Sequence, residues 1–385
     1  MRKVYCLIGL LIVMALHVNA SDNQNREIVE RVDAVIRTHY GVDASNAPGL
    51  GIMVTRHGEL QFKKAYGIAN AENSSPLPTS TNLRMASVSK QFTSMATYLL
   101  IEQGKLSFDT PLSEIFDNLP AWSTQITVGH LMNHTSGIWD YEVLIPRDHQ
   151  EQVTDADVLH MISSVDSTYF TPGSQFRYSN TGYCLLSLIV ERVSNTDYRE
   201  YMKEHIFQPL GMTNAYMYHA GTDMLGRAFG YRPPVAGRND NYRYAYQSIT
   251  SATKGDGCVY VSPEGYHTWA NAVLRTSFPS SAYLTQVDQR KTPVKDGIYY
   301  SMGWFVAPAN SSQGMRLFHS GETTGFRNIV YHDLGTGLSI SIFANRDDAH
   351  ISAVFEEVVK LMKDAHPVVS APEHQELFFW MSSVY

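Results

Sequence analysis

Leu83-Arg84-Met85-Ala86-Ser87-Val88-Ser89-Lys90-Gln91-Phe92-Thr93 is the stretch around which this sequence is organised. If it opens a helix, Ser87 lies in the first turn and Lys90 follows one turn later on the same face. The serine would then lie near unpaired helix N–H groups and near an amine that can take its proton, as an acyl-transfer nucleophile requires. The alternative is that Ser87 only caps the helix, because serine often begins helices.

A second S-x-x-K tetrad, Ser251-Ala252-Thr253-Lys254, shows that the spacing alone is a weak signal. Apolar residues at helical spacing follow Lys90, and the run stops at Gly104. After Lys254 comes Gly255-Asp256-Gly257, which breaks a helix. The context therefore favours Ser87 as the candidate nucleophile.

The composition is that of a globular protein with a large core. The chain has 385 residues, of which 44% are hydrophobic and 17% are charged, enough for one large domain or two interleaved ones. The net charge is −7 without long charge runs, so nucleic acid and anionic membrane surfaces are not expected partners.

The two ends of the sequence differ from its body. In residues 1–20, Arg2 and Lys3 precede an apolar run that ends at Val18-Asn19-Ala20, and this pattern predicts a signal peptide cleaved near Ala20. We therefore expect export to the periplasm or the medium, and no stable membrane span, because the run is short. Residues 366–385 form a tail whose Leu377–Met381 cluster is expected to pack on the domain.

After cleavage two cysteines remain, Cys184 and Cys258. Pairing is open to them in an oxidising compartment, but a single bridge is not a disulfide scaffold. Burial as separate thiols is the favoured interpretation.

The order of elements predicts an α+β fold within residues 21–365. A helix and a β-hairpin come first, a helical insertion covers about residues 104–250, and three strands and a closing helix come last. The hairpin must share one antiparallel sheet with the late strands, because two strands do not stand alone. The expected ranges are helix 26–40, hairpin 50–66, insertion helices 128–133, 155–163, 181–193 and 198–206, strands 315–319, 326–332 and 338–344, and helix 351–362. Residues 216–246 are predicted to be a loop, whose tyrosines either line a substrate cleft or hold the loop down.

Three further stretches accompany the serine motif. They are Leu131-Met132-Asn133-His134-Thr135-Ser136-Gly137-Ile138, Pro172-Gly173-Ser174-Gln175-Phe176-Arg177-Tyr178-Ser179-Asn180-Thr181-Gly182-Tyr183, and His319-Ser320-Gly321-Glu322-Thr323-Thr324-Gly325-Phe326. Tyr178-Ser179-Asn180 is the only Y-x-N in the chain. With these motifs, the sequence resembles the superfamily of serine β-lactamases and penicillin-binding proteins, and within it the class C β-lactamase-related branch. S-x-x-K, Y-x-N and H/K-x-G occur in the order found in that superfamily, and the likeness runs from about Arg26 to Asp364.

The resemblance assigns roles to individual residues. It implies that Ser87 is the nucleophile and that Lys90, with a pKa lowered by its surroundings, accepts the serine proton. It implies that Tyr178 relays protons, and either Lys90 or Tyr178 is the principal base. Asn180 would hydrogen-bond a substrate amide or hold Lys90. The backbone N–H groups of Ser87 and Glu322 would form the oxyanion hole.

His319-Ser320-Gly321 departs from the β-lactamase pattern, in which a lysine holds the first position. Histidine is mostly uncharged at neutral pH, so recognition of a substrate carboxylate is not expected, and esters or other peptides become better candidates. Lys295-Asp296-Gly297, His39-Tyr40-Gly41 and His219-Ala220-Gly221 also fit the short pattern but lack the flanking strand and turn.

Other chemistries fit poorly. The sequence has no G-x-S-x-G elbow, and His130 and His134 lack the glutamate of H-E-x-x-H, so no metal and no cofactor are expected.

The favoured hypothesis is an exported serine hydrolase acting on an ester or a small peptide or amide, of the esterase, D-aminopeptidase or D-Ala carboxypeptidase type. The alternatives are a true class C-like β-lactamase and a non-catalytic binder of cell-wall peptides. The sequence leaves the oligomeric state open.

Overall fold

The computed structural model describes residues 26–40, 47–220, 226–235, 241–245, 247–275, 277–311, 313–348 and 350–364. The predicted signal peptide and the C-terminal tail lie outside these ranges. Among the described residues, none of the helices is long and apolar enough to cross a bilayer.

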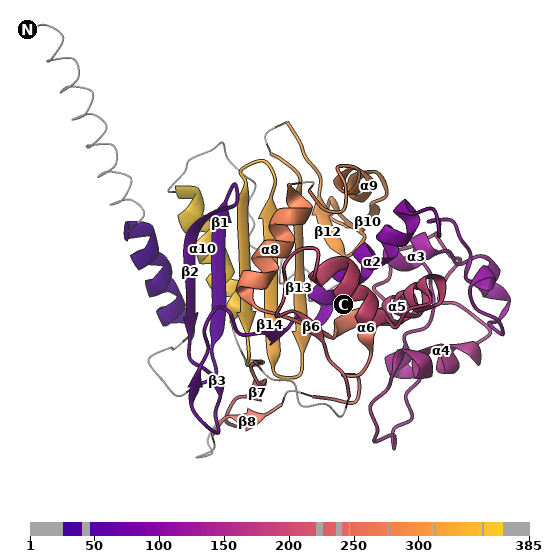
Figure 1. The fold of residues 1–385 in the computed structure, drawn as a ribbon, viewed down its shortest axis with the longest axis horizontal. Helices are drawn as coiled ribbons and strands as arrows, with labels where there is room; N and C mark the ends of the chain where they lie inside the picture. The colour runs from indigo at the N-terminus through magenta and orange to yellow at the C-terminus, as the bar shows by residue number, and fades with distance from the viewer. Residues whose placement is uncertain are drawn as a thin grey trace, which may run out of the picture.

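An eight-stranded antiparallel sheet, with helices on both faces, forms one side of the molecule (Figure 1). The sheet brings together an early and a late strand of the chain. β1 pairs with β15 along its whole length, from Leu50 opposite Ala344 to Arg56 opposite Leu338. The predicted α+β class with a shared antiparallel sheet is confirmed. The strands in sheet order are β10 (Thr292–Lys295), β11 (Ile298–Ser301), β12 (Trp304–Ala307), β13 (Arg316–Thr323), β14 (Phe326–Asp333), β15 (Leu338–Ala344), β1 (Leu50–Arg56) and β2 (Glu59–Tyr66).

The central strands are apolar because both faces of the sheet are covered. The helix of residues 26–40 and α10 (Ile351–Asp364) lie on one face, and α8 (Pro263–Leu274) lies on the other (Figure 1). In β15 six of seven residues are buried, whereas the edge strand β2 exposes most of its residues, including Lys63 and Lys64 in part. Charged side chains on an edge discourage pairing with another chain.

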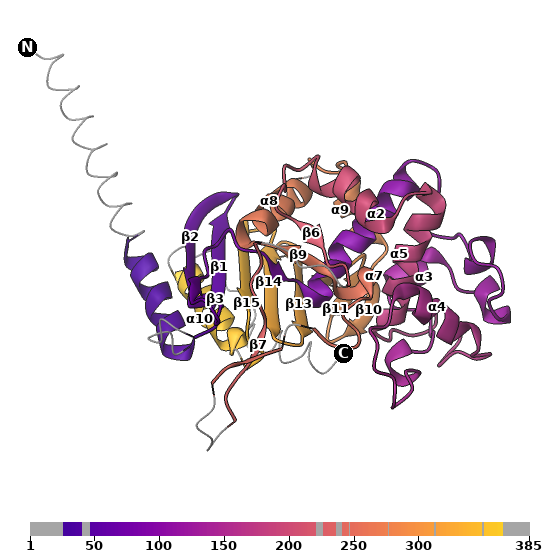
Figure 2. The same ribbon diagram turned by 60° about the horizontal axis from the view of Figure 1, so that its bottom comes forward.

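The helical region fills the other side of the molecule, around α2 (Lys90–Glu102) (Figure 2). This helix is buried nearly all round, and its polar residues are paired inside the protein: Thr93 Oγ1 donates to Gly255 O over 2.6 Å, and Ser94 Oγ lies 3.1 Å from Tyr183 Oη. The helices around it are α3 (Val128–Met132), α4 (Asp155–Ser163), α5 (Asn180–Ser194), α6 (Tyr198–Met202), which continues into the π-helical η5 (Lys203–Phe207), α7 (Lys254–Gly257) and α9 (Tyr283–Gln289).

Short elements connect the two regions. A three-stranded sheet in the order β5–β9–β6 lies between them, and its strand β5 leads into the 3₁₀ turn η1 (Ala86–Ser89) and then into α2. The short strands are β3 (Ile68–Asn70), β4 (Ser75–Pro76), β5 (Leu83–Arg84), β6 (Tyr216–Met217), β7 (Tyr231–Arg232), β8 (Arg243–Tyr244) and β9 (Val259–Val261), and the other 3₁₀ turns are η2 (Leu112–Glu114), η3 (Ala121–Thr124) and η4 (Tyr141–Val143).

Two expectations differ from the structure. Strands β9 to β12 and helices α8 and α9 were not predicted, and β10 to β12 give the main sheet three more strands than the sequence indicated. The stretch predicted as a loop, residues 216–246, contributes the short strands β6, β7 and β8.

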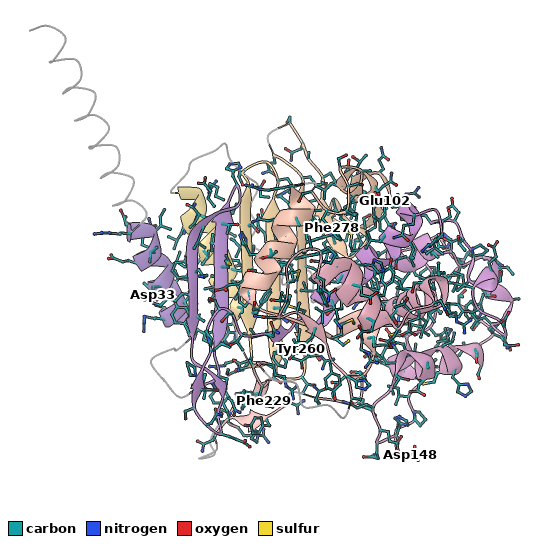
Figure 3. The ribbon with its side chains drawn as sticks, viewed as in Figure 1. Asp33, Glu102, Asp148, Phe229, Tyr260 and Phe278 are labelled. Atoms are coloured by element: carbon teal, nitrogen blue, oxygen red, sulfur yellow. The ribbon has the colours of Figure 1, made fainter. Side chains whose placement is uncertain are left out.

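The tyrosines of that stretch hold it against the rest of the fold. Tyr231 Oη accepts the N–H of Ala71, and Tyr244 Oη donates to Asn70 Oδ1 over 2.8 Å. Phe229, near these rings, lies well away from Tyr260 toward the edge where β3, β7 and β8 gather (Figure 3). Of the two interpretations of the tyrosines, these contacts favour anchoring.

Candidate active site

Ser87 lies in η1, where the edge of β13 packs against the turn. The preceding residue, Ala86, has a φ of 48°, a conformation that a non-glycine residue adopts only when its surroundings impose it. Ser87 is not a helix cap: the cap positions of η1 and α2 belong to Met85 and Ser89, and neither makes a side-chain capping bond. The Ser87 hydroxyl oxygen instead accepts a hydrogen bond from Lys90 Nζ, 3.1 Å away.

Lys90 is fully buried, with three acceptors around its Nζ. These are Ser87 Oγ at 3.1 Å, Asn180 Oδ1 at 2.9 Å and the carbonyl oxygen of Asp256 at 3.0 Å. Burial lowers the pKa of Lys90 to about 8, although the nearby carboxylates of Asp256 and Glu142 oppose the shift. An ammonium donates to all three acceptors, but a neutral amine has a lone pair free, and Ser87 O–H can then donate to it. The geometry therefore fits a lysine that removes the serine proton.

Tyr178 and Asn180 reach Lys90 from the start of α5. Ser179 caps this helix by accepting the N–H of Gly182, which places Asn180 in the first turn. The Tyr178 ring lies with its centre 4.9 Å from Lys90 Nζ. Asn180 holds Lys90 with its oxygen and donates with Nδ2 to Glu142 Oε1 over 3.1 Å. Two roles were suggested for Asn180, binding a substrate amide and holding Lys90. The structure shows the second of these contacts.

The motif around His134 supports the Tyr178 segment, a function that the sequence did not indicate. His134 is buried, its Nδ1 accepts the N–H of Ser179 over 3.1 Å, and its carbonyl oxygen accepts the N–H of Arg177 over 2.9 Å. Its ring lies 4.2 Å from the Tyr178 ring, centre to centre. Burial and the charge of Lys90 lower the pKa of His134 well below its usual value, so it remains neutral with the proton on Nε2.

His319 is buried near Tyr178 and is not exposed as a charged side chain. Its Nε2 accepts a hydrogen bond from Tyr300 Oη over 3.2 Å, and its Nδ1 donates to the carbonyl oxygen of Ser320. Burial lowers the pKa of His319 to about 3, so the ring carries no charge at neutral pH. A neutral, buried ring offers a substrate carboxylate no ionic partner.

Gly321 allows β13 to approach the nucleophile closely. A Cβ at this position would lie 2.3 Å from Met85 O and 3.3 Å from Ser87 N, so any side chain would separate the strand from η1. Glu322, the next residue, has an exposed side chain that pairs with Arg327. Its N–H belongs to the strand that Gly321 brings against the backbone of η1.

The segment around Asp256 is held by a residue that sequence reasoning missed. The buried carboxylate of Asp155, in the first turn of α4, accepts the N–H groups of Lys254 over 2.8 Å and Gly255 over 3.2 Å. These bonds fix the short helix α7, whose Asp256 carbonyl reaches Lys90. Burial raises the pKa of Asp155 to about 6.

The competing motifs have structural partners. Ser251 Oγ accepts a hydrogen bond from Arg84 Nη1 over 2.7 Å, while Lys254 pairs with Glu191, so the second S-x-x-K is not a serine–lysine pair. Lys295 ends β10, and Asp296-Gly297 forms the exposed turn that leads to β11.

Two remaining features are the state of the cysteines and the arrangement of side chains that could bind a metal ion. Cys184 and Cys258 are buried free thiols, which confirms the favoured interpretation. Within the ranges that the structure describes, His, Cys, Asp and Glu side chains form no group of three suited to a metal ion.

The chain is similar to known proteins in sequence and in fold. The family model described as Beta-lactamase matches residues 29–357. Penicillin-binding protein 4* of Bacillus subtilis (strain 168) is 26% identical over 314 residues, which cover 77% of this chain and 68% of that protein. The chain spans about two thirds of the length of the curated relatives it matches.

Two solved structures share the fold. The penicillin-binding protein from Bacillus halodurans has a TM-score of 0.75 and 25% identity, covering 86% of this chain and 98% of that one. The D-amino acid amidase from Ochrobactrum anthropi SV3, solved with L-phenylalanine amide, has a TM-score of 0.72 and 22% identity, covering 88% of this chain and 99% of that one. The second likeness concerns the fold alone.

Proposed function

Because the chain belongs to the Beta-lactamase family, we propose that it is an exported serine hydrolase that forms an acyl-enzyme on Ser87. The observation that carries the proposal is the contact of 3.1 Å between Ser87 Oγ and a buried Lys90 whose pKa is lowered to about 8. Structural pressure alone does not account for a buried lysine that is bonded only to uncharged oxygens and lies beside a serine in a strained turn.

In the first half of the reaction, neutral Lys90 takes the proton of Ser87 as Oγ attacks the substrate carbonyl carbon. The negative oxygen that forms lies against the N–H groups of Ser87 and Glu322. Tyr178, whose ring lies over Lys90 Nζ, passes a proton to the leaving alcohol or amine as the carbonyl reforms, and the Lys90 ammonium gives the serine proton to Tyr178 in its place. Water then attacks the acyl carbon and gives a proton to these groups, which pass a proton to Ser87 Oγ as its bond to the acyl carbon breaks and the acid is released.

The substrate is proposed to be an ester or a small peptide or amide. The neutral, buried His319 supports this choice, because it supplies no fixed charge for the carboxylate that β-lactams carry. The fold that this chain shares with a D-amino acid amidase also fits an amide substrate. Export rests on the pattern of residues 1–20.

Intact-mass analysis after exposure to a fluorophosphonate tests the proposal, with Ser87→Ala as control. One adduct on the natural protein, absent from the variant, is expected. A folded protein without an adduct would refute the hydrolase and leave the cell-wall peptide binder as the explanation. A labelled protein is next given esters, D-amino-acid amides, D-Ala peptides and β-lactams, and rapid β-lactam turnover would favour the β-lactamase alternative.

A further inference from the structure

We propose that Asn328 is a positioning residue that sets the geometry of the oxyanion hole, an inference that rests on the proposed function. Asn328 lies on β14 directly opposite Gly321 of β13, and it is 1% exposed. Its Nδ2 donates to the carbonyl oxygen of Arg84 over 2.9 Å and lies 3.4 Å from the carbonyl oxygen of Gly321. One side chain thus connects the strand that leads to Ser87 with the strand that carries Glu322.

The contact with Gly321 orients the peptide group that supplies the second N–H. In a trans peptide, the carbonyl of one residue and the N–H of the next point in opposite directions. The Gly321 carbonyl turns toward Asn328 on β14, so the Glu322 N–H turns the other way, toward the edge of β13 that faces away from β14, while η1 packs against the same strand. On that edge β12 pairs with β13 only as far as Phe318, so the sheet leaves this N–H unpaired.

The contact with Arg84 fixes the other side of the oxyanion hole. Arg84 ends β5, and its backbone is three residues before Ser87. Its guanidinium is itself held by Ser251 Oγ and by the carbonyl oxygen of Gly257. Asn328 therefore ties Glu322 to a rigid backbone and keeps the two N–H donors at a constant separation.

This position requires a hydrogen-bond donor. Both neighbouring groups are carbonyl oxygens, so the side chain must present donors to them. The other atom, Asn328 Oδ1, is buried without a hydrogen-bond partner in the described part of the chain. An orphaned acceptor is unfavourable, and its presence indicates that the orientation of Nδ2 has been retained for another purpose.

Asn328→Ser and Asn328→Asp test the proposal. Serine shortens the side chain, and an ionised aspartate of nearly the same shape cannot donate. Asn345→Ser is the matched control: Asn345 is buried in the same way and its side chain bonds only backbone groups, those of Gly49, Ile68 and Phe229, none of which belongs to the site.

The readouts are the fluorophosphonate labelling rate at saturation, the half-saturation concentration and the affinity for a boronic acid, whose tetrahedral anion needs the oxyanion donors. Removing one such donor slows catalysis by about 10²–10³-fold, so loosening both should slow labelling by on the order of 10- to 100-fold. We expect that loss in both Asn328 variants, with a parallel loss of boronate affinity and little change in half-saturation. In Asn328→Asp the loss should shrink at low pH, relative to the natural protein, as the carboxyl gains a proton to donate.

Labelling at the natural rate in folded Asn328→Ser would overturn the proposal, and so would an equal loss in Asn345→Ser. If one Asn328 variant does not fold, the other decides the question. If the natural protein itself takes no label, the proposed function fails and this inference falls with it.

Discussion

The pH dependence of serine labelling should follow the proton of Lys90. Folding buries this side chain completely and lowers its pKa from 10.5 to about 8. Only the neutral amine accepts the Ser87 proton, so the rate rises with pH. The neutral fraction is about 0.1 at pH 7 and about 0.9 at pH 9, a rise of about tenfold that levels off. A lysine with its ordinary pKa would give a rise of about 100-fold over the same interval, without a plateau.

The assay is the second-order rate of fluorophosphonate labelling between pH 6 and 10, with Ser87→Ala as background. A rate independent of pH would show that Lys90 is not the base, and a tenfold rise per unit up to pH 10 would show that its pKa is not lowered. Either result refutes the reasoning.

Glu142→Gln gives a second test of the same charge balance. Glu142 raises the pKa of Lys90 through its negative charge, and its oxygen accepts from Asn180 Nδ2, which a glutamine oxygen also does. The substitution should therefore move the midpoint of the profile to lower pH. Glu264→Gln, which alters a carboxylate bound to Lys63 and Thr79, should leave the midpoint unchanged.

Three further substitutions separate the site from the scaffold. Gly321→Ala should slow labelling by at least about 10²-fold, because its Cβ would lie 2.3 Å from the backbone oxygen of Met85; normal labelling would show that β13 can move away at no cost. Asn345→Ala should lower the free energy of unfolding by about 3 kcal/mol, measured by denaturant titration, for three lost hydrogen bonds, while the folded protein still labels. Tyr178→Phe should keep the adduct but slow turnover of an identified ester by about 10²-fold or more, whereas loss of the adduct would make Tyr178 the principal base.

The parts of the fold that the sequence predicted have strong local patterns. Leu338–Ala344 alternates after a glycine-containing turn, and the strands β13 to β15 follow one another as hairpins. Strands β10 to β12 are four residues each, β10 contains Pro293, and all four residues of Trp304–Ala307 are buried. A short run without alternation has no period to detect.

The site residues divide in the same way, into those with a local sequence motif and those without one. Ser87, Lys90, Tyr178 and Asn180 were identified because their motifs are short and ordered along the chain, and the structure brings them together. Asn328 was not identified, because one polar residue inside an apolar strand carries no local signal of what it contacts. Its partners, like those of Asp155, are distant in the sequence and become neighbours only through the tertiary fold.

Several elements of the fold surround Lys90, and burying this side chain has a cost in the free energy of unfolding. A lysine whose pKa falls from 10.5 to about 8 on folding destabilises the protein by about 3 kcal/mol below pH 8, and this cost disappears as the pH rises from 8 to 10.5, where the unfolded chain binds the extra proton. Asn180 from α5 and the Asp256 carbonyl from α7 hold the ammonium and keep that cost from being larger. The lowered pKa that weakens the fold at neutral pH is the same property that supplies a neutral amine to Ser87. Stability and nucleophile activation are therefore opposed at this residue. Any change that returns Lys90 to water would stabilise the fold and weaken the activation of Ser87.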